Sequence, residues 1–386
     1  METVAASTAE TDSAKAGAAL AEQINAALPL PPHVIILFAA PTYDHPILLQ
    51  ALCDATPSAL IVGASSAGEF TNDTMGVGLA TALAIRDEES RFTAVIGHDL
   101  KVNPSAAARE IVSGFAGPLD HNYPYRSALI LTDALAGYAD ALADALTLET
   151  AGDYQFFGGG AGDNASFERT TVFCGTQVLA DCAVGLEILS HKPLGVGVSH
   201  GWEPASESLR VTEAAGLRLV SLNGMPAIEA FEEHAEAKSE RIDRAAPIPF
   251  FLQNIIGIDT GSGYRLRVPL AVNDDGSINC AAEIPTGSIV RIMKSSHASA
   301  AEAAERATDA AIAAIGPNPP KAALFFDCVA TRLRCGDRFQ AEVDAVMSRI
   351  GNAALAGCNT HGQIARAEGQ FEGFHNCTAV VCVFPG

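Results

Sequence analysis

The sequence predicts a mixed α/β (α+β) fold with two related lobes, each a mixed β-sheet flanked by helices, and a cleft between them. The main observation is one short pattern, G-x-x-[ST]-x-G-[EQ]-[FI], which occurs twice in the 386 residues, at 63–70 and at 357–364. Each copy also follows a strand-like and a helix-like segment. Because ligand sites commonly lie between lobes, the doubled pattern indicates a site as well as a fold.

The segments before the two copies come in the same order. Before the first copy, apolar residues predict a strand over 33–38 and a helix over 44–53. Before the second copy, a strand is predicted over 322–326 and a helix over 337–350, whose apolar residues share one face. A strand, a helix and a second strand that ends in a glycine-bracketed loop form one supersecondary unit. The chain is therefore predicted to contain this unit twice.

The first half of the chain contains further elements. Residues 1–13 are small, polar and acidic and are expected to be frayed, whereas 15–28 are predicted to be helical. Asn103 followed by Pro104 is typical of a helix start, because asparagine caps the first turn and proline fits its first position. We also predict a strand at 127–131, a helix at 138–148, and one antiparallel sheet of short strands at 154–157, 170–173, 177–179, 183–189 and 194–198.

The second half has its own start and stop signals. A helix is predicted over 226–237, and Asn273-Asp-Asp-Gly276 is typical of a hairpin turn. The longest helix is expected to begin with a capping box of Ser299 and Glu302 and to end at Gly316. A change in composition near 215–225 predicts an N-terminal tail and helix at 1–32, a first domain at 33–218 and a second domain at 219–386.

Charge and cysteine content exclude several classes of protein. The net charge of −21 argues against binding to nucleic acid or to an anionic membrane surface, since both require clustered Lys and Arg. The nine cysteines are odd in number and contain no C-x-x-C pair, which favours reduced thiols and a cytoplasmic location over a secreted disulfide framework. With no apolar run of transmembrane length and no signal peptide, we expect no membrane anchor.

A glycine cluster at 158–162 is the first candidate site. It resembles a dinucleotide-binding loop, but Asp163 stands where the third glycine is needed and no helix follows. Two interpretations remain. Gly160 and Asp163 line a ligand site, or Asp163 caps a tight turn of its own loop.

The two copies of the doubled pattern supply most of the other candidates. Two features argue against Ser65 as a hydrolase nucleophile. No helix follows it, and Asn359 takes its place in the second copy. Cys358 and His361 form a Cys–His pair of the kind used in nucleophilic catalysis, or are simply a buried thiol and a loop imidazole. The candidate ligand-binding residues from the two loops are Ser65, Gly68, Glu69, Cys358, His361 and Gln363.

Three arginines follow the strand that ends near Cys328. Arg332, Arg334 and Arg338 are available to bind an anion, or to pair with neighbouring acids. Of these we include Arg332 among the candidate ligand-binding residues. No histidine spacing indicates a zinc site, but a single axial histidine for haem leaves almost no trace in a sequence.

Together these motifs resemble the FIST family, which has an N-terminal and a C-terminal FIST domain. The resemblance extends from about residue 33 to residue 384 and rests on short motifs in a fixed order. Those motifs are Gly63–Glu69, Gly159–Asp163, Ser199-His200-Gly-Trp202-Glu-Pro204, Val211–Ala214, Asn223–Ala227, Phe325-Phe-Asp-Cys328, the loop at Gly357 and His375-Asn376-Cys-Thr378. Two positions depart from the family: Gln363 replaces a glutamate, and the arginine after Cys328 is displaced to Arg332.

The resemblance implies a cytosolic sensor that binds a small ligand and regulates a separate signalling partner. Amino-acid-like ligands are suggested for the family. One free-standing branch contains haem and senses nitric oxide, regulating a histidine kinase or a cyclic-di-GMP enzyme, and there His200 is the first candidate for the axial ligand, with His361 second. The alternative hypothesis is an enzyme of small-molecule metabolism that uses Cys358, Asp163 and Glu69 in the cleft.

Overall fold

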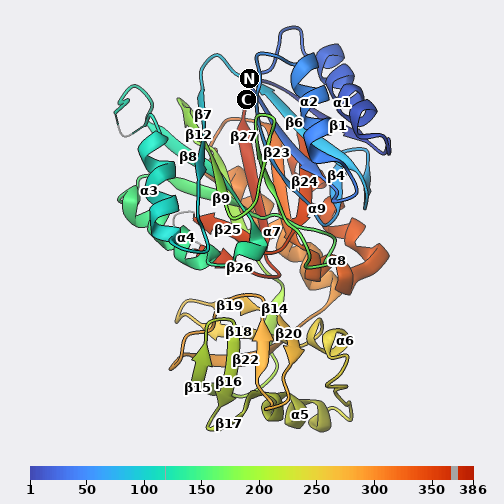
Figure 1. The fold of residues 1–386 in the computed structure, drawn as a ribbon, viewed down its shortest axis with the longest axis vertical. Helices are drawn as coiled ribbons and strands as arrows, with labels where there is room; N and C mark the ends of the chain where they lie inside the picture. The colour runs from blue at the N-terminus through green and yellow to red at the C-terminus, as the bar shows by residue number, and fades with distance from the viewer. Residues whose placement is uncertain (118, 367–372) are drawn as a thin grey trace.

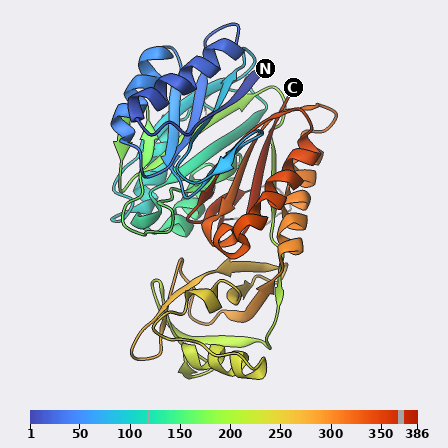
Figure 2. The same cartoon turned by 90° about the vertical axis from the view of Figure 1, so that its right-hand side faces the viewer.

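The computed structural model describes residues 1–117, 119–366 and 373–386 and confirms a mixed α/β fold in two domains (Figure 1). The larger domain holds three six-stranded sheets, and the smaller one holds a separate nine-stranded sheet. The chain enters the smaller domain after about residue 200 and returns near residue 296. In both views the two termini lie at the end of the larger domain that is far from the smaller one (Figures 1 and 2).

The first unit of the larger domain joins two parallel strands by one helix. Its elements are β1 (Glu2–Thr8), α1 (Ser13–Ala27), β2 (Val34–Ala39), α2 (His45–Ala55), β3 (Leu60–Ser65) and β6 (Ala80–Arg86). β2 runs parallel to β3, and β6 lies antiparallel between β1 and β2. The prediction that residues 1–13 are frayed was wrong, because β6 supplies a complete ladder of partners for β1 and Ala6 is buried in the core.

The second unit repeats this arrangement and was not foreseen as a repeat. Its elements are β7 (Arg91–Gly97), α3 (Pro104–Gly114), β8 (Tyr125–Thr132), α4 (Ala139–Glu149), β9 (Gln155–Gly160) and β12 (Ala183–Ser190). β8 runs parallel to β9, and β12 lies antiparallel between β7 and β8. Asn103 caps α3 as predicted, its side chain accepting a hydrogen bond from the Ala106 amide.

The third unit follows the same plan but is interrupted by the smaller domain. Its elements are β13 (Gly195–Ser199), α7 (His297–Ala314), β23 (Pro320–Cys328), α8 (Val329–Cys335), α9 (Gln340–Ile350), β24 (Ala354–Thr360) and β27 (Ala379–Pro385). β23 runs parallel to β24, and β27 lies antiparallel between β13 and β23. Figure 2 shows α7 and α9 side by side on the outer face of this sheet, where the predicted apolar face of α9 is buried.

Each unit also gives a hairpin to the sheet of another unit. The hairpins are β4–β5 (Glu69–Thr71, Met75–Gly76), β10–β11 (Val172–Cys174, Gln177–Leu179) and β25–β26 (Gln363–Arg366, Gly373–His375). β4 pairs with β24, β10 pairs with β3, and β25 pairs with β9. The five short strands predicted as one antiparallel sheet therefore lie in three different sheets, and that prediction was wrong. Each hairpin follows a glycine loop, so the exchange brings the three loops together.

One glycine position marks the repeat in all three units. It lies in the second parallel strand, opposite a residue of the first, and leaves no room for a side chain. A Cβ atom would lie 2.1 Å from the Leu37 carbonyl oxygen at Gly63, 2.1 Å from that of Ile130 at Gly158, and 2.3 Å from that of Phe325 at Gly357. The first and third belong to the doubled pattern, and Gly158 opens the glycine cluster.

The smaller domain is built from the chain between β13 and α7. Its elements are β14 (Trp202–Pro204), β15 (Leu209–Ala215), β16 (Arg218–Leu222), β17 (Met225–Pro226), α5 (Ala227–Ala237), α6 (Ile248–Phe251), β18 (Ile255–Asp259), β19 (Tyr264–Arg267), β20 (Pro269–Val272), β21 (Ile278–Cys280) and β22 (Ile289–Ser295). The predicted turn at 273–276 joins β20 to β21. The predicted boundary between residues 218 and 219 falls at the start of β16, inside this domain.

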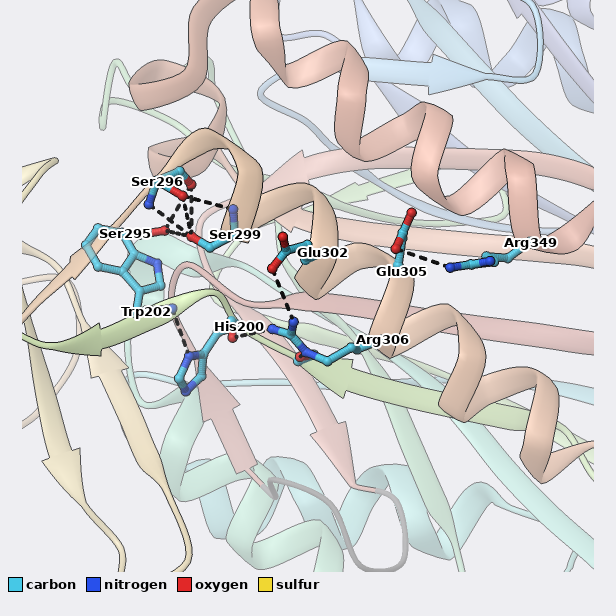
Figure 3. Close-up of polar contacts among 10 residues, drawn as sticks. His200, Trp202, Ser295, Ser296, Ser299, Glu302, Glu305, Arg306 and Arg349 are labelled. Carbon is cyan, nitrogen blue, oxygen red and sulfur yellow. Dashed lines mark hydrogen bonds and ion pairs between the residues drawn. The ribbon is translucent and has the colours of Figure 1, made fainter.

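Both connections between the domains pass the N-terminus of α7 (Figure 3). Ser296, not Ser299, caps this helix. Ser296 accepts a hydrogen bond from the Ser299 amide (3.0 Å), and the Ser299 hydroxyl accepts one from the Ser296 amide (2.9 Å). The predicted capping box was therefore placed one turn late. Glu302 instead lies 4.0 Å from Arg306, one turn along the helix.

Candidate functional site

The loops that follow β3, β9 and β24 meet and bind one another through their backbones. The first and third loops exchange two hydrogen bonds, from Ala67 N to Asn359 O (2.9 Å) and from Asn359 N to Gly68 O (2.8 Å). The second loop joins both, since Gly162 N donates to Ser65 O (2.7 Å) and Gly160 N donates to Gly362 O (2.9 Å). The predicted candidates from both copies of the pattern and from the glycine cluster therefore lie around one point.

Two candidates of the first loop anchor that loop. The Ser65 hydroxyl accepts a hydrogen bond from the Thr171 amide (3.0 Å). Glu69 is fully buried and accepts hydrogen bonds from the Ser66 hydroxyl (2.6 Å) and the Leu79 amide (3.0 Å). Burial raises the pKa of Glu69 to about 7, although its hydrogen bonds oppose the shift.

This raised pKa predicts a pH dependence of stability. The unfolded chain releases the Glu69 proton near its ordinary pKa of 4.5 and the folded protein near 7, so raising the pH through this range favours unfolding. The loss is on the order of 3 kcal/mol. Glu69→Gln should remove it, because an amide does not titrate and Gln363 already fills the matching position of the third unit. Urea unfolding at pH 5 and pH 8 measures the effect. An unchanged pH difference in the variant would show that another group is responsible.

The corresponding side chain of the third loop is also an anchor. Gln363 is fully buried. In the amide orientation that satisfies both ends, its oxygen accepts from the Thr360 hydroxyl (2.8 Å) and the Cys328 amide (3.2 Å), and its nitrogen donates to Thr378 O (3.2 Å). Cys358 pairs with Glu69 in the β24–β4 ladder, and burial raises the pKa of its thiol well above the ordinary value.

Asp163 shapes the second loop and contacts His361. Its carboxylate accepts hydrogen bonds from the amides of Phe167 (3.0 Å), Glu168 (2.7 Å) and Arg169 (3.0 Å), so it caps its own loop. One carboxylate oxygen also lies 3.4 Å from His361 Nε2. The loop holds Phe167 at a φ of 54°, which is uncommon for a large side chain, and its ring stacks on the His361 imidazole at 4.9 Å between centroids.

Arg332 lies at the same meeting point. Its Nη2 donates a hydrogen bond to the Asn164 side chain (2.7 Å), and a Cβ atom at Gly68 would lie 3.1 Å from its Cδ. Burial lowers the pKa of Arg332, and the nearby carboxylate of Glu69 opposes this. Arg332 therefore ties the third unit to the loops of the other two.

A pocket of about 460 Å³ opens beside these loops, between the two domains. The larger domain contributes the turn after β8, the start of α8, Phe167, His361 and Asn376. The smaller domain contributes Gly216, Leu217, Val268, Leu270, Cys280, Ala281 and Glu283. Most of these side chains are apolar, and the volume suits a small organic molecule.

Two buried polar side chains stand out in this apolar lining. Within the described part of the chain, neither ring nitrogen of His361 makes a hydrogen bond, and Asn376 Oδ1 has no donor. The exposed fraction is only 4% for the His361 side chain and 2% for Asn376. Burial lowers the pKa of His361, which favours the neutral imidazole. Buried polar atoms normally have partners, so both indicate a ligand.

An ion pair between a buried arginine and a carboxylate joins the two domains. Arg267 of β19 donates two hydrogen bonds to Asp140 of α4 (2.8 and 2.9 Å) and one to Phe374 O (3.2 Å). The Arg267 side chain is 2% exposed, so its charge depends on Asp140 for compensation. This contact, which the sequence analysis did not foresee, fixes how the smaller domain sits over the loops.

His200 lies apart from the loops, on the strand that leads into the smaller domain (Figure 3). Its Nδ1 accepts a hydrogen bond from the Trp202 amide (3.3 Å), and its Nε2 bonds Tyr264 O (3.2 Å). An axial haem ligand needs a free ring nitrogen and room for the macrocycle. The cavity beside His200 is about 10 Å³, so these surroundings do not fit a haem.

His361 has a cavity beside it but meets the requirements of haem only in part. Phe167 covers one face of its ring. Among the residues that the structure describes around this pocket, none is a lysine or arginine that could pair with haem propionates. The described residues therefore fit a neutral organic ligand better than a haem.

The enzyme hypothesis relied on three side chains, Glu69, Cys358 and Asp163, that do not line the inter-domain pocket. Glu69 and Cys358 are buried in the β4–β24 ladder and do not line the inter-domain pocket. Asp163 holds its own loop. The sequence analysis missed Asn376 as a pocket residue, although it lies in the motif His375-Asn376-Cys-Thr378. It also missed Tyr138 and Phe167, whose unusual backbone leaves no mark on the sequence.

The two-domain fold agrees with the family that the sequence matches. The FIST N domain matches residues 33–225 and the FIST C domain matches residues 227–366. The chain belongs to the FIST family, whose domains are associated with sensing small ligands in signal transduction. Among curated proteins none matches the chain. Across the described residues, no helix is both long and apolar enough to cross a membrane.

Proposed function

We propose that this protein senses a small, neutral and largely apolar molecule in the pocket between its two domains. The observation that carries the proposal is the pair of buried polar side chains, His361 and Asn376, in a largely apolar cavity whose one carboxylate, Glu283, is exposed. A bound molecule that hydrogen-bonds both would remove a desolvation penalty of about 1–3 kcal/mol for each. The family membership supports a sensor rather than a purely structural role.

The pocket chemistry narrows the ligand. The described lining contains no lysine or arginine to neutralise a carboxylate, so a free zwitterionic amino acid is less suited than a neutral derivative. Tyr138 and Phe167 offer ring faces, and Asn376 Oδ1 accepts a hydrogen bond. A neutral aromatic molecule with a hydroxyl group satisfies these groups, because a hydroxyl both donates and accepts and can therefore hydrogen-bond Asn376 and His361 together. Nitric oxide bound through haem is the second candidate, favoured only by His361 Nδ1, which makes no hydrogen bond within the described residues.

Ligand binding is communicated to a signalling partner by a change in the position of the smaller domain. The pocket has walls from both domains, so a ligand that contacts both stabilises one domain arrangement over others. A cytoplasmic histidine kinase or cyclic-di-GMP enzyme that reads this arrangement would be the regulated partner. The acidic surface, with a net charge of −21, favours a partner with a basic docking face.

His361→Phe is expected to reduce ligand content at least tenfold, because it removes the hydrogen-bonding group and keeps the ring. The control is His121→Phe, which changes an exposed histidine outside the pocket. Mass spectrometry of small molecules released from the purified, denatured proteins measures the ligand. The same compound should come from the wild type and the control. Equal amounts from all three proteins would contradict the assignment.

An absorption spectrum separates the two candidate ligands. We expect no Soret band that depends on His361, either as purified or after addition of haemin. The wild type and His361→Phe should therefore give the same spectrum. A Soret band that is lost in His361→Phe but kept in His121→Phe would show that haem, and not a neutral molecule, binds at this site.

A further inference from the structure

We propose that Cys328 and Cys377 form a redox-active dithiol, which becomes a disulfide when a hydroperoxide enters the inter-domain pocket. The two cysteines come from the motifs Phe325-Phe-Asp-Cys328 and His375-Asn376-Cys-Thr378, and the proposed ligand site makes no use of either thiol. The proposal concerns the wall of the pocket and holds whether or not the pocket binds the proposed ligand.

The fold holds these two cysteines side by side. β23 and β27 are antiparallel neighbours, with Phe326 opposite Val380, so Cys328 at the end of β23 meets the turn that precedes β27. Gln363 fixes the two segments, accepting from the Cys328 amide (3.2 Å) and donating to Thr378 O (3.2 Å). Both cysteines are buried members of one apolar cluster.

Only one of the two cysteines faces the inter-domain pocket. Cys328 lines it, which gives a small oxidant a route to its sulfur. Cys377 instead lines the small cavity on the other side, together with Trp202 and Arg334. This arrangement gives the two thiols different roles. Cys328 reacts first with the hydroperoxide, and Cys377 then attacks the oxidised Cys328 sulfur.

The electrostatics agree with this division. The neighbouring Cys377 side chain lowers the pKa of Cys328, which favours the nucleophilic thiolate. Interaction with Cys328, together with burial, raises the pKa of Cys377 well above its ordinary value, so the Cys377 thiol keeps its proton.

The reaction proceeds in two balanced steps. The Cys328 thiolate attacks the terminal oxygen of the hydroperoxide, the O–O bond breaks, and the departing alkoxide takes a proton to leave as an alcohol or as water. Cys328 is then a sulfenic acid. The Cys377 sulfur attacks the Cys328 sulfur, the S–O bond breaks, and the thiol proton leaves with the hydroxide as water. Two thiols lose two electrons, and the peroxide gains them.

The disulfide would act on the domain interface. The cluster that contains both cysteines also contains Trp202, Val268 and Met293 of the smaller domain. Oxidation therefore changes the packing between the domains from the larger-domain side.

The test is peptide mass spectrometry of the full chain under non-reducing conditions after treatment with equimolar hydrogen peroxide. We expect a Cys328–Cys377 link in the wild type and in the control Cys382→Ser, whose buried thiol lies further along β27. Cys377→Ser should instead accumulate a Cys328 sulfenic acid that dimedone traps. Ala281→Trp, which fills the pocket, should slow the linkage at least tenfold.

Two results would overturn the proposal. One is a wild type in which peroxide modifies Cys53 or Cys174, the two partly exposed thiols, while Cys328 stays reduced. The other is a linkage rate that Ala281→Trp leaves unchanged, which would show that the oxidant does not reach Cys328 through the pocket. Both are measured on the wild type or on the pocket variant Ala281→Trp, so neither depends on the folding of a cysteine variant.

Discussion

Replacing Gly158 by alanine is expected to destabilise the larger domain by more than about 4 kcal/mol, because the new methyl group collides with backbone. Its Cβ would lie 2.1 Å from the Ile130 carbonyl oxygen, in the centre of a sheet where neither strand has room to move. Gly158 also has a φ of 138°, which a side chain disfavours. The free energy of unfolding in urea measures the loss.

Gly175→Ala provides the matched control. Gly175 also has a positive φ, 59°, but nothing lies within 4 Å of its Cβ position in the turn between β10 and β11. Gly175→Ala should lower the free energy of unfolding by about 1 kcal/mol, which is the cost of the backbone conformation alone. Similar losses for the two variants would show that close packing at Gly158 does not matter. Alanine at Gly63 or Gly357 should behave like alanine at Gly158 if the three units are equivalent.

Asp140→Ala is expected to destabilise the protein by about 3–5 kcal/mol, because it leaves the charge of Arg267 buried without a counter-ion. Hydrogen–deuterium exchange should rise along β19 and β26, whose residues meet at this contact. The control is Asp144→Ala, which removes an exposed carboxylate one turn along the same helix.

A double variant separates loss of the ion pair from loss of packing. Asp140→Leu combined with Arg267→Met removes both charges and should regain much of the stability that Asp140→Ala loses. If the double variant is as unstable as Asp140→Ala, the uncompensated charge is not the cause.

Local elements were predictable because their signals lie close together in the sequence. Asn103 and Pro104 mark the start of α3, and the predicted face of α9 is buried. The errors concern long-range pairing. β1 needs β6, about 80 residues away, to be a strand, and the five short strands divide among three sheets because each unit exchanges a hairpin with another. The second unit escaped notice because its loop, Gly158–Asp163, lacks the doubled pattern.

The site was predictable only where loops carry a pattern. The glycines marked three candidate loops but did not show that all three meet. The alternative in which Asp163 caps its own loop agrees with its three amide hydrogen bonds. Asn376, Arg267 and Phe167 gave no such signal. Asn376 and Arg267 matter because the smaller domain packs over the loops. Phe167 matters because of its positive φ, which the residue type does not reveal.

The most direct test of the central claim, that the inter-domain pocket binds a small neutral molecule, is a calorimetric titration with phenol. Phenol is aromatic and neutral, and its hydroxyl group both donates and accepts a hydrogen bond. The account predicts one site per chain with a dissociation constant below about 1 mM in the wild type, and the same in Ala245→Trp, which changes an exposed loop. Ala281→Trp, which fills the pocket, should abolish binding. Absence of binding to the wild type, or equal binding to Ala281→Trp, would contradict the claim.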